Sequence, residues 1–563
     1  MPSDKPARPR SIEPTSTVTR SLNRRDFIKA ASISAGGALL GGAAGSLYAK
    51  TGGLPKPNKS GIEHIVLVTM ENRSFDHFLG WLSGANGMQA GLSYIDVAGN
   101  AQSTYGLNPD FQGCGHADPD HSYAGGRIQY DSGKCDGFLQ TAPAGDKFPI
   151  GYYTQSDLAF LGNAAPGWTT FSGYFAAIMA ETFPNRIYQH AAQTDRIDNS
   201  TSISTLPTIW DRLADHSISR RYYFSDIPLL ALWGTKYLPI SAPIANFFAD
   251  CAAGTLPHVS FVEPRFLGES QGVSSDDHPF ADVRNGEAFL NSVYAAITLS
   301  PTWQNTVLII NFDEWGGFFE HVPPTTAPIP PADAAAGNQD GLRGFRVPCV
   351  IISPWSPRGG VMNGVFDHTS VLNMIEWRWN LRPLTVRDAT AQNLALALDF
   401  SVSDLTAPQY AVPSGPFGSV CNTTVVTPFA STRPTNENWD GLRNVALQVR
   451  LACGITECAS TELNCRARSP QVSSQRSRGA HLLEECLPRL HVQRAERQNC
   501  PRLGRIRPCS QEPFAPSKSA LRRMSLPTPG IIPSSLHVSR DLQSCGKHSR
   551  NAVLHNFRDR ACS

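Results

Sequence analysis

The sequence predicts an α/β fold whose central, mostly parallel sheet is flanked by helices. Residues 62–68 and 307–310 form nearly continuous apolar runs, which are typical of strands buried on both faces of a parallel sheet. Further runs of this kind alternate with helix-like segments at intervals of roughly 20–50 residues. With 563 residues and a globular composition, the chain is long enough for more than one domain.

The charges are distributed unevenly along the chain. Residues 1–50 carry eight Lys and Arg against three Asp and Glu, and residues 451–563 carry eighteen against eight. The middle of the chain, residues 51–450, carries 23 against 36 and is therefore acidic. Because a nucleic-acid partner requires a basic surface, the sequence argues against one. An excess of carboxylates suits a cation site better.

Residues 1–50 have the form of a twin-arginine export signal. Arg24 and Arg25 precede a weakly apolar stretch that contains five glycines, a composition more typical of a cleaved signal than of a membrane-spanning helix. Asn23 stands where such signals usually have Ser or Thr. The alternative is a basic disordered arm. An export signal predicts a periplasmic or secreted protein that crosses the membrane through the twin-arginine machinery.

A linker over residues 51–60 leads into the predicted catalytic domain, residues 61–430. Its first strand is followed at once by Glu71 and Asn72. The second strand, predicted over 306–315, has an apolar run at 307–310 that leads into Asp313 and Glu314. Ligands of open α/β sheets bind outside the carboxyl ends of the strands. If the two strands are neighbours, these four side chains form an oxygen-rich cluster, and a divalent cation offsets the repulsion between the carboxylates.

The identity of the cation stays open. Oxygen ligands favour a hard ion such as Mg²⁺, Ca²⁺ or Mn²⁺, although Zn²⁺ also binds carboxylates. The strand–helix alternation continues to the end of the domain. The predicted strands cover 222–226, 258–262 and 347–352, and the predicted helices cover 206–215, 282–298 and 371–379.

Thr182 lies just before Pro184, a residue suited to the first position of a helix. A hydroxyl at such a position faces the unpaired N–H groups of the first turn, where a phosphate also binds. Thr182 is therefore a candidate nucleophile for phosphoryl transfer. The competing interpretation is an ordinary helix cap, which is the commoner role of Thr there.

Three segments together resemble the bacterial phosphoesterase family of non-specific phospholipases C and acid phosphatases, which is similar in fold to the alkaline phosphatase superfamily. These segments are MENRSFDHFLGWL, ETFPNRIYQHA and NFDEWGGFFEHVPPT, and the resemblance extends over residues 62–398. It implies that Thr182 is the nucleophile, that Asn185 supports the phosphoryl oxygens, and that His321 contacts the substrate.

The resemblance also implies catalytic histidines in two polar loops. His121, in an Asp-Pro-containing loop, is preferred to His116, with a surface histidine as the alternative. His278 follows Asp276 and Asp277, and a histidine there is suited to donate a proton near neutral pH. The alternative for this second loop is a helix cap built on one of the two aspartates.

Residues 431–563 read as a basic, Cys/Arg/Ser/Pro-rich tail without the periodicity of a core. The sequence predicts that this tail is poorly ordered and that a chain ending near Arg433 stays folded and active. A disulfide-stapled module is the alternative, because eight of the 13 cysteines follow residue 450. An oxidising compartment would allow Cys114 and Cys135, which are close in sequence, to pair, and the disulfide pairing stays open.

The favoured function is an exported, metal-dependent phospholipase C acting on phosphatidylcholine-type lipids, with peripheral membrane contact. An acid phosphatase acting on small phosphomonoesters uses the same metal site and is the first alternative. A sulfatase would need a C/S-x-P-x-R motif, which the sequence does not contain. The second alternative is a secreted, non-catalytic binding protein with the same fold.

Overall fold

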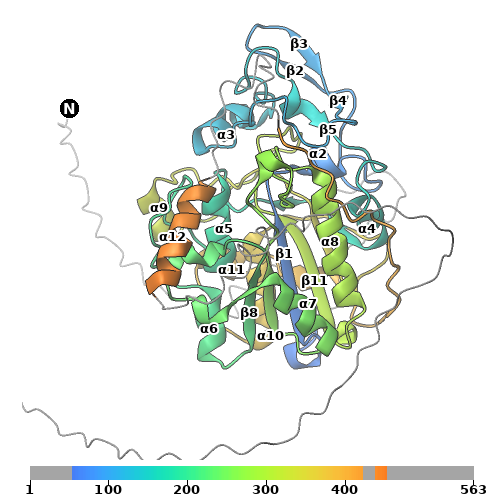
Figure 1. Ribbon diagram of the computed structural model, residues 1–563, viewed down its shortest axis with the longest axis vertical. Helices are drawn as coiled ribbons and strands as arrows, with labels where there is room; N and C mark the ends of the chain where they lie inside the picture. The colour runs from blue at the N-terminus through green and yellow to red at the C-terminus, as the bar shows by residue number, and fades with distance from the viewer. Residues whose placement is uncertain (1–52, 422–437, 453–563) are drawn as a thin grey trace, which may run out of the picture. The chain divides into compact units, whose positions relative to one another are not determined.

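The computed structural model describes residues 53–421 and 438–452 (Figure 1). The predicted export signal and most of the predicted tail lie outside the described residues. The sheet at the centre of the described part has eight strands in the order β13-β6-β12-β11-β1-β10-β8-β9. Its strands are β1 (His64–Met70), β6 (Thr169–Phe171), β8 (Arg220–Phe224), β9 (Ser241–Pro243), β10 (Val259–Val262), β11 (Thr306–Phe312), β12 (Cys349–Ile352) and β13 (Val361–Met362).

The predicted α/β class is confirmed, because most strand pairs of this sheet are parallel. Strands β11, β1, β10, β8 and β9 form a continuous parallel block. Strand β12 is antiparallel to both of its neighbours. The strands expected at residues 62–68, 258–262, 306–315 and 347–352 all have their counterparts in this sheet, although β11 ends at Phe312 rather than at residue 315.

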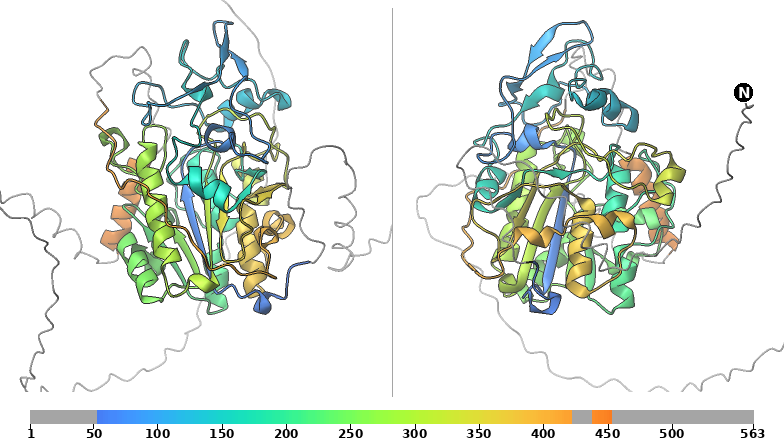
Figure 2. Two further views of the ribbon diagram at one scale, coloured as in Figure 1. Left: turned by 90° about the vertical axis from the view of Figure 1, so that its right-hand side faces the viewer. Right: turned by 180° about the vertical axis from the view of Figure 1, so that it is seen from behind.

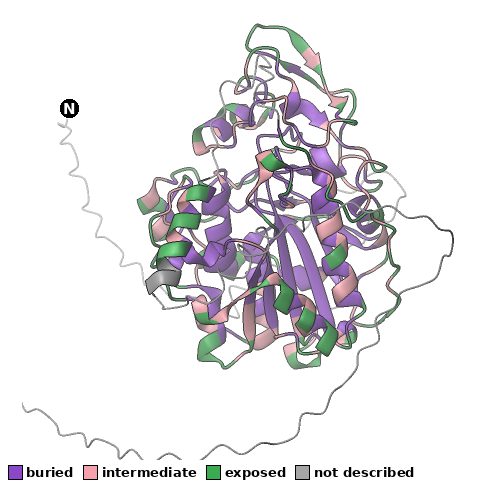
Figure 3. Cartoon of the chain, viewed as in Figure 1, coloured by how far each residue is buried: buried purple, intermediate pink, exposed green. Residues whose placement is uncertain are grey.

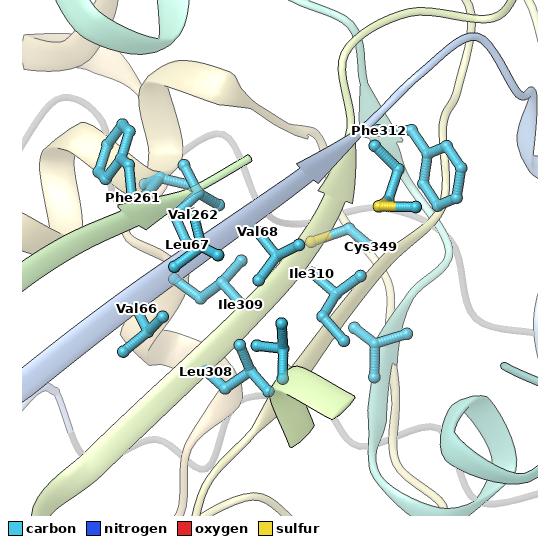
Figure 4. Packing of buried hydrophobic residues seen from close by; sticks show 14 of the residues in the cluster. Val66, Leu67, Val68, Phe261, Val262, Leu308, Ile309, Ile310, Phe312 and Cys349 are labelled. Carbon is cyan, nitrogen blue, oxygen red and sulfur yellow. The ribbon is translucent and has the colours of Figure 1, made fainter. Parts of the chain in front are cut away.

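The core consists of the apolar side chains of the central strands. All residues of β11 and all but the first of β1 are buried (Figure 3). Val68 and Ile310 lie opposite each other in the parallel register, and Figure 4 shows their side chains among those of Val66, Phe261 and Cys349. The continuous apolar runs of the sequence therefore correspond to strands that pack on both faces.

Helices cover both faces of the sheet, as the left panel of Figure 2 shows with α8 and α10 on opposite sides. Helices α5 and α10 pack together on one side, and α7 and α8 on the other. The larger helices are α3 (Tyr123–Tyr130), α4 (Leu161–Gly167), α5 (Thr182–Ala191), α6 (Ile209–Asp215), α7 (Ile244–Ala253), α8 (Val283–Thr298), α10 (His368–Trp379) and α12 (Trp439–Ala452). The shorter ones are α2 (Phe75–Leu79), α9 (Pro331–Ala336) and α11 (Val386–Thr390).

The segment between α2 and α4 lies beyond the carboxyl ends of the central strands, at the top of Figure 1. It carries two small two-stranded sheets, and a third joins β7 to β14 elsewhere. Their strands are β2 (Ser93–Ile95), β3 (Ala101–Ser103), β4 (Tyr105–Gly106), β5 (Gly151–Tyr152), β7 (Tyr174–Phe175) and β14 (Phe366–Asp367). Within the described residues, no helix has both the length and the apolar character that a membrane crossing requires.

The boundary predicted at residue 430 is too early. Helix α12 lies beyond it and packs on the catalytic part through Trp439, Leu442 and Ala446, all of which are buried. The ring of Trp439 stacks on that of Phe266, with 4.4 Å between centroids. These positions are three and four residues apart and so share one face of the helix. The expectation of a poorly ordered tail is therefore wrong for α12.

The disulfide pairing that the sequence left open is not between Cys114 and Cys135. Cys114 is bonded to Cys421, 307 positions later, whereas Cys135 is a free, buried thiol. Proximity in sequence suggested the first pairing, but the fold brings residue 421 beside the loop of residue 114. The backbone N–H of Cys421 donates to Ser270 O over 2.8 Å, which places this end of the described segment against the loop at 268–272.

Candidate active site

The two strands that were expected to deliver carboxylates are direct neighbours. Met70 and Phe312, the last residues of β1 and β11, lie opposite each other in the register. The next residues along each strand are Glu71 and Asp313, so both enter the same edge of the sheet. The Asn72 backbone N–H donates to Asp313 Oδ1 over 3.1 Å, which joins the two strand ends. The predicted meeting of these strands is confirmed.

Thr182 points into this cluster from the start of α5. Its hydroxyl donates to Glu71 Oε2 over 3.1 Å and lies 3.4 Å from Asn72 Oδ1. All three side chains are fully buried. The cap position of α5 is occupied by Glu181 rather than Thr182. Thr182 is therefore not the cap of α5, and its role as the nucleophile stays a prediction.

Helix α5 begins two residues earlier than Pro184 had suggested. Pro184 is its third residue, a position where proline is tolerated because the first-turn N–H groups have no partner within the helix. One of those groups is already used, since Phe183 N–H donates to Asn199 Oδ1 over 2.7 Å. That donor is therefore not available to a phosphate, contrary to the simple picture of an open helix terminus.

Arg186 is the site residue that sequence reasoning missed. Its guanidinium is fully buried and forms ion pairs with Glu71, Glu263 and Asp313, with 3.2 Å from Nε to Asp313 Oδ2. Burial by itself would lower the pKa of Arg186, but the charges of the three carboxylates raise it well above its ordinary value. Its position four residues after Thr182, on the same helix face, was the available signal.

Part of the positive charge that offsets the repulsion between the carboxylates thus comes from Arg186, whereas the prediction from the sequence assigned this role to a metal ion alone. One guanidinium carries a single positive charge, while Glu71, Asp313, Glu263 and the adjacent Glu314 offer four carboxylates. The oxygens of Glu71 and Asn72 converge on Thr182 Oγ1, and this set of hard oxygen donors suits a divalent cation. The residues present therefore fit a bound metal ion.

Glu314 and Asp313 are held by the backbone of the turn that they begin. Glu314 N–H donates to Asp313 Oδ1 over 2.7 Å, and Gly316 N–H donates to Glu314 Oε2 over 2.8 Å. His368 contacts the backbone of this turn, with 2.6 Å between its Nε2 and Asp313 O. Burial lowers the pKa of His368 to about 4, so the ring is neutral and donates this hydrogen bond.

The two preferred histidines come together beside Asn72. His121 Nε2 lies 3.4 Å from Asn72 Nδ2, and its ring centroid is 6.4 Å from that of His278. His278 Nδ1 is 2.7 Å from Glu269 Oε2, and both histidines are buried. The cap of α8 is Asp282, so the alternative that residues 276 and 277 form a helix cap is wrong.

His116, the histidine that was not preferred, lies elsewhere. Its Nδ1 is 2.8 Å from Asp146 Oδ1, and its Nε2 is 3.3 Å from Asp110 Oδ2. Burial alone would lower its pKa, but the two carboxylates raise the pKa of His116 to about 9. Its ring stacks on Phe148, with 4.5 Å between centroids. These contacts indicate a structural ion-pair network.

Asn185 has a role different from the predicted contact with phosphoryl oxygens. Its Oδ1 accepts from Ile178 N–H over 3.1 Å, and its Nδ2 donates to Ala180 O over 2.8 Å and to Glu181 O over 3.2 Å. The amide is therefore engaged with the backbone of residues 178–181. It holds the turn that presents Thr182, and it acts on the site through that turn.

His321 is not brought to Thr182. It belongs to a second acidic group, in which its Nδ1 lies 2.5 Å from Asp76 Oδ2 and 3.6 Å from Glu320 Oε1. Among the described residues, these three form the acidic group whose ligand atoms all lie within 4.8 Å of one another, as in a metal site, whereas Glu71, Asp313 and Glu314 do not meet that spacing. The buried Arg346 already compensates the second group, with 3.2 Å to Asp76 and 2.5 Å to Glu320. Both acidic groups thus contain a buried arginine, and the cation site at Glu71, Asn72, Asp313 and Glu314 stays a prediction.

Comparison with known proteins shows similarity to one protein family and to phospholipases C. A model of the phosphoesterase family matches residues 62–382. Phospholipase C A of Mycobacterium tuberculosis (strain ATCC 25618 / H37Rv) is 30% identical over 459 residues, covering 68% of this chain and 86% of that protein. Phospholipase C B of the same strain is 30% identical over 522 residues, covering 76% and 97%.

Similarity extends to plant proteins and to a solved structure. Non-specific phospholipase C1 of Arabidopsis thaliana is 31% identical over 379 residues, covering 60% of this chain and 71% of that protein. A protein in the alkaline phosphatase superfamily from Vibrio parahaemolyticus, whose crystal structure is solved, gives a TM-score of 0.32 at 10% identity, covering 59% of this chain and 70% of that one.

Proposed function

Because the chain belongs to the phosphoesterase family and is a hydrolase of phosphate esters, we propose that it is an exported, metal-dependent phospholipase C. The observation that carries the proposal is the position of Thr182. Its hydroxyl lies against Glu71 and Asn72, at the point where β1 and β11 end side by side. A buried hydroxyl that donates to a carboxylate is prepared to lose its proton and to act as a nucleophile.

The chain's own residues account for the remaining steps. The Thr182 oxygen attacks phosphorus and its proton passes to Glu71, while the bond between phosphorus and the leaving alcohol breaks. His121 or His278 gives the leaving oxygen a proton. A water molecule then gives a proton to that histidine as its oxygen attacks phosphorus, the bond to Thr182 breaks, and the Thr182 oxygen takes back the proton from Glu71. Arg186 keeps Glu71 and Asp313 in place throughout.

Glu71, Asn72, Asp313 and Glu314 are the residues that would hold the divalent cation, which when bound offsets phosphate charge and lowers the pKa of the nucleophile. Mg²⁺, Ca²⁺, Mn²⁺ and Zn²⁺ all remain candidates for this set of oxygen donors. The buried turn at Asp313 and Glu314 fixes two of these side chains before any ion binds.

The proposed substrate is a phospholipid of the phosphatidylcholine type, reached through peripheral contact with a membrane surface. Support comes from the relatives, which are named phospholipases C in both mycobacteria and Arabidopsis. Export through the twin-arginine machinery rests on residues 1–50, which lie outside the described part of the chain. An acid phosphatase that acts on phosphomonoesters is the alternative that the experiment below separates.

Replacement of the nucleophile tests the proposal. Thr182→Ala should lower kcat by several orders of magnitude and leave substrate binding largely intact, whereas Thr182→Ser should retain much of the activity. Thr385→Ala is the matched control, because Thr385 caps α11. Its loss should cost about 1 kcal/mol of stability and leave kcat nearly unchanged.

The assay compares release of diacylglycerol from phosphatidylcholine vesicles with hydrolysis of 4-nitrophenyl phosphate, with and without a chelator. We expect lipid hydrolysis that the chelator abolishes and an added divalent cation restores. Near-parent turnover by Thr182→Ala would disprove the mechanism. Activity on the monoester alone would replace phospholipase C by acid phosphatase.

A further inference from the structure

The proposed reaction leaves two histidines, His121 and His278, as candidates for the proton donor, and their surroundings differ in charge. His121 Nδ1 lies 2.8 Å from Pro119 O, a backbone carbonyl oxygen. Its Nε2 lies 3.4 Å from Asn72 Nδ2, an amide nitrogen. Neither of these two partners carries a negative charge that would favour a protonated ring.

His278 instead lies between two carboxylates. Its Nδ1 is 2.7 Å from Glu269 Oε2, and its Nε2 is 3.7 Å from Asp118 Oδ2. Negative charge on both sides favours the protonated ring, which is the form that has a proton to give. His278 and Glu269 also line the same pocket of about 700 Å³ as Glu181, the residue before Thr182. The charged pair therefore lies close to the turn that carries the candidate nucleophile.

The side chain of Glu269 is held by a residue of α12. Trp439 Nε1 donates to Glu269 Oε1 over 3.2 Å, while the other oxygen, Oε2, faces His278. The ring of Trp439 is fixed in turn, because it stacks on Phe266 with 4.4 Å between centroids. One carboxylate thus divides its two oxygens between a fixed donor and the histidine, which sets the direction in which the histidine ring points.

The backbone around Glu269 is held as well. Glu269 begins the short 3-10 helix η6 (Glu269–Gln271). Gln112 Nε2 donates to Glu269 O over 3.4 Å and to Ser419 O over 2.8 Å. Cys421 N–H donates to Ser270 O over 2.8 Å. These contacts fix the short helix against two other segments of the chain, as the support of a precisely placed catalytic group requires.

We propose that Glu269 is a positioning residue, which orients His278 as the group that gives the leaving alcohol its proton. The proposal rests on the proposed function and deepens it, since it chooses between the two histidines and adds a residue that does not touch the reacting atoms. As the bond between phosphorus and the leaving oxygen breaks, that oxygen takes the proton from His278 Nε2. The ring is left neutral, with its Nδ1–H still directed at Glu269, and Glu269 keeps its negative charge.

Two phosphodiesters that differ in the leaving group test the proposal. Dihexanoyl phosphatidylcholine releases a glycerol alcohol, which leaves poorly as an alkoxide and therefore needs a proton. 4-Nitrophenyl phosphocholine releases 4-nitrophenolate, a stable anion that needs none. Both substrates leave the same group on Thr182, so a comparison of their kcat/KM values reports the first step of the reaction.

Glu269→Gln keeps the shape of the side chain and removes its charge. The ratio of kcat/KM for the lipid to kcat/KM for the nitrophenyl ester should fall at least about tenfold, as part of the about 10²–10⁴-fold that a general acid supplies. Glu63→Gln is the matched control, because Glu63 is exposed and precedes β1, at the opposite end of that strand from Glu71. Its ratio should equal that of the parent. An unchanged ratio in Glu269→Gln would overturn the proposal.

A double-mutant cycle shows whether Glu269 acts through His278. His278→Asn removes the proton donor and should lower the same ratio. Adding Glu269→Gln to this variant should then lower the ratio by less than about twofold, because two residues that act as one unit are not additive. A further tenfold fall would mean that Glu269 acts independently of His278, and it would overturn the proposal.

A measurement without turnover separates failure of this pairing from failure of the proposed function. Nuclear magnetic resonance of the full-length protein, with nitrogen-labelled histidine, identifies the ring signals of His278 as those that His278→Asn lacks. Glu269→Gln should shift these signals, and Glu63→Gln should not. If the parent cleaves neither ester, the proposed function is wrong, and a shift still supports the pairing. Unshifted His278 signals in Glu269→Gln would overturn the pairing whether or not an ester is cleaved.

Discussion

At the scale of single residues, the charge balance of the candidate active site depends on Arg186. Its guanidinium contacts three buried carboxylates, and Arg186 Nη2 also donates to Met70 O over 3.3 Å. A buried charge that has its partners is stable, whereas carboxylates left without a partner are costly. The residue therefore holds the strand ends together and keeps Glu71 oriented toward Thr182.

Removing this charge should be much more damaging than removing an exposed one. Arg186→Met should lower the free energy of unfolding by about 3 to 5 kcal/mol, because it strands buried carboxylates. Arg221→Met, which breaks the partly exposed pair with Asp250, is the control and should cost less than about 1 kcal/mol. Urea denaturation followed by circular dichroism measures both.

The pH dependence gives this prediction a second readout. The stranded carboxylates have pKa values above those of the unfolded chain, so the folded variant takes up protons more readily than the unfolded one. The free energy of unfolding of Arg186→Met is lower than that of the parent, and this difference should therefore shrink as the pH falls from 7 toward 5. A small difference in the free energy of unfolding at pH 7, or a difference that grows as the pH falls, would contradict the role assigned to Arg186.

At the scale of elements, α12 supports both sides of the candidate site. At its start, Asn438 Nδ2 donates to Asn199 O over 3.2 Å, and Asn199 in turn accepts from the first turn of α5. Trp439 donates to Glu269, which lies 2.7 Å from His278. Helix α12, which follows the catalytic part in sequence, thus supports the turn that carries Thr182 and the position of His278, a candidate catalytic histidine.

Two truncations separate α12 from the residues that follow it. A chain that ends at residue 452 should keep parent activity and stability. A chain that ends at residue 437 should lose several kcal/mol of stability, since burial of a tryptophan alone is worth about 3 to 5 kcal/mol. Its kcat should fall at least tenfold. Thermal unfolding measures the stability, and release of diacylglycerol from phosphatidylcholine vesicles measures kcat. Equal stability and equal kcat of the two chains would refute the supporting role of α12.

The sequence was sufficient for the elements with regular local patterns. The apolar runs of β1 and β11 identified both strands, and the carboxylates after them identified the edge of the sheet. The residues 439, 442 and 446 have helical spacing too, but they lie at the start of a basic region whose composition predicted a poorly ordered tail. Arg186 was missed because an arginine on a helix usually faces solvent, and only the fold shows three carboxylates around it.

At the scale of the whole described molecule, the segment after η8 (Leu394–Ala397) returns along α8 to the loops beside the site. Tyr294 of α8 donates to Pro408 O over 2.8 Å, and Phe417 N–H donates to Asn285 Oδ1 over 2.9 Å. The disulfide between Cys114 and Cys421 then fixes the end of this segment. No local pattern could have predicted that pairing, because its two cysteines are 307 positions apart.

The same disulfide makes a covalent ring of most of the catalytic part, and a ring that is opened once stays in one piece. A single protease cut in a surface loop between residues 114 and 421 should leave a product that migrates near the intact chain on a denaturing gel without reductant. Addition of dithiothreitol to the same sample should release two fragments. With Cys421→Ser, one cut should yield two fragments in either gel, and a nicked parent that separates without reductant would show that the ring is not closed.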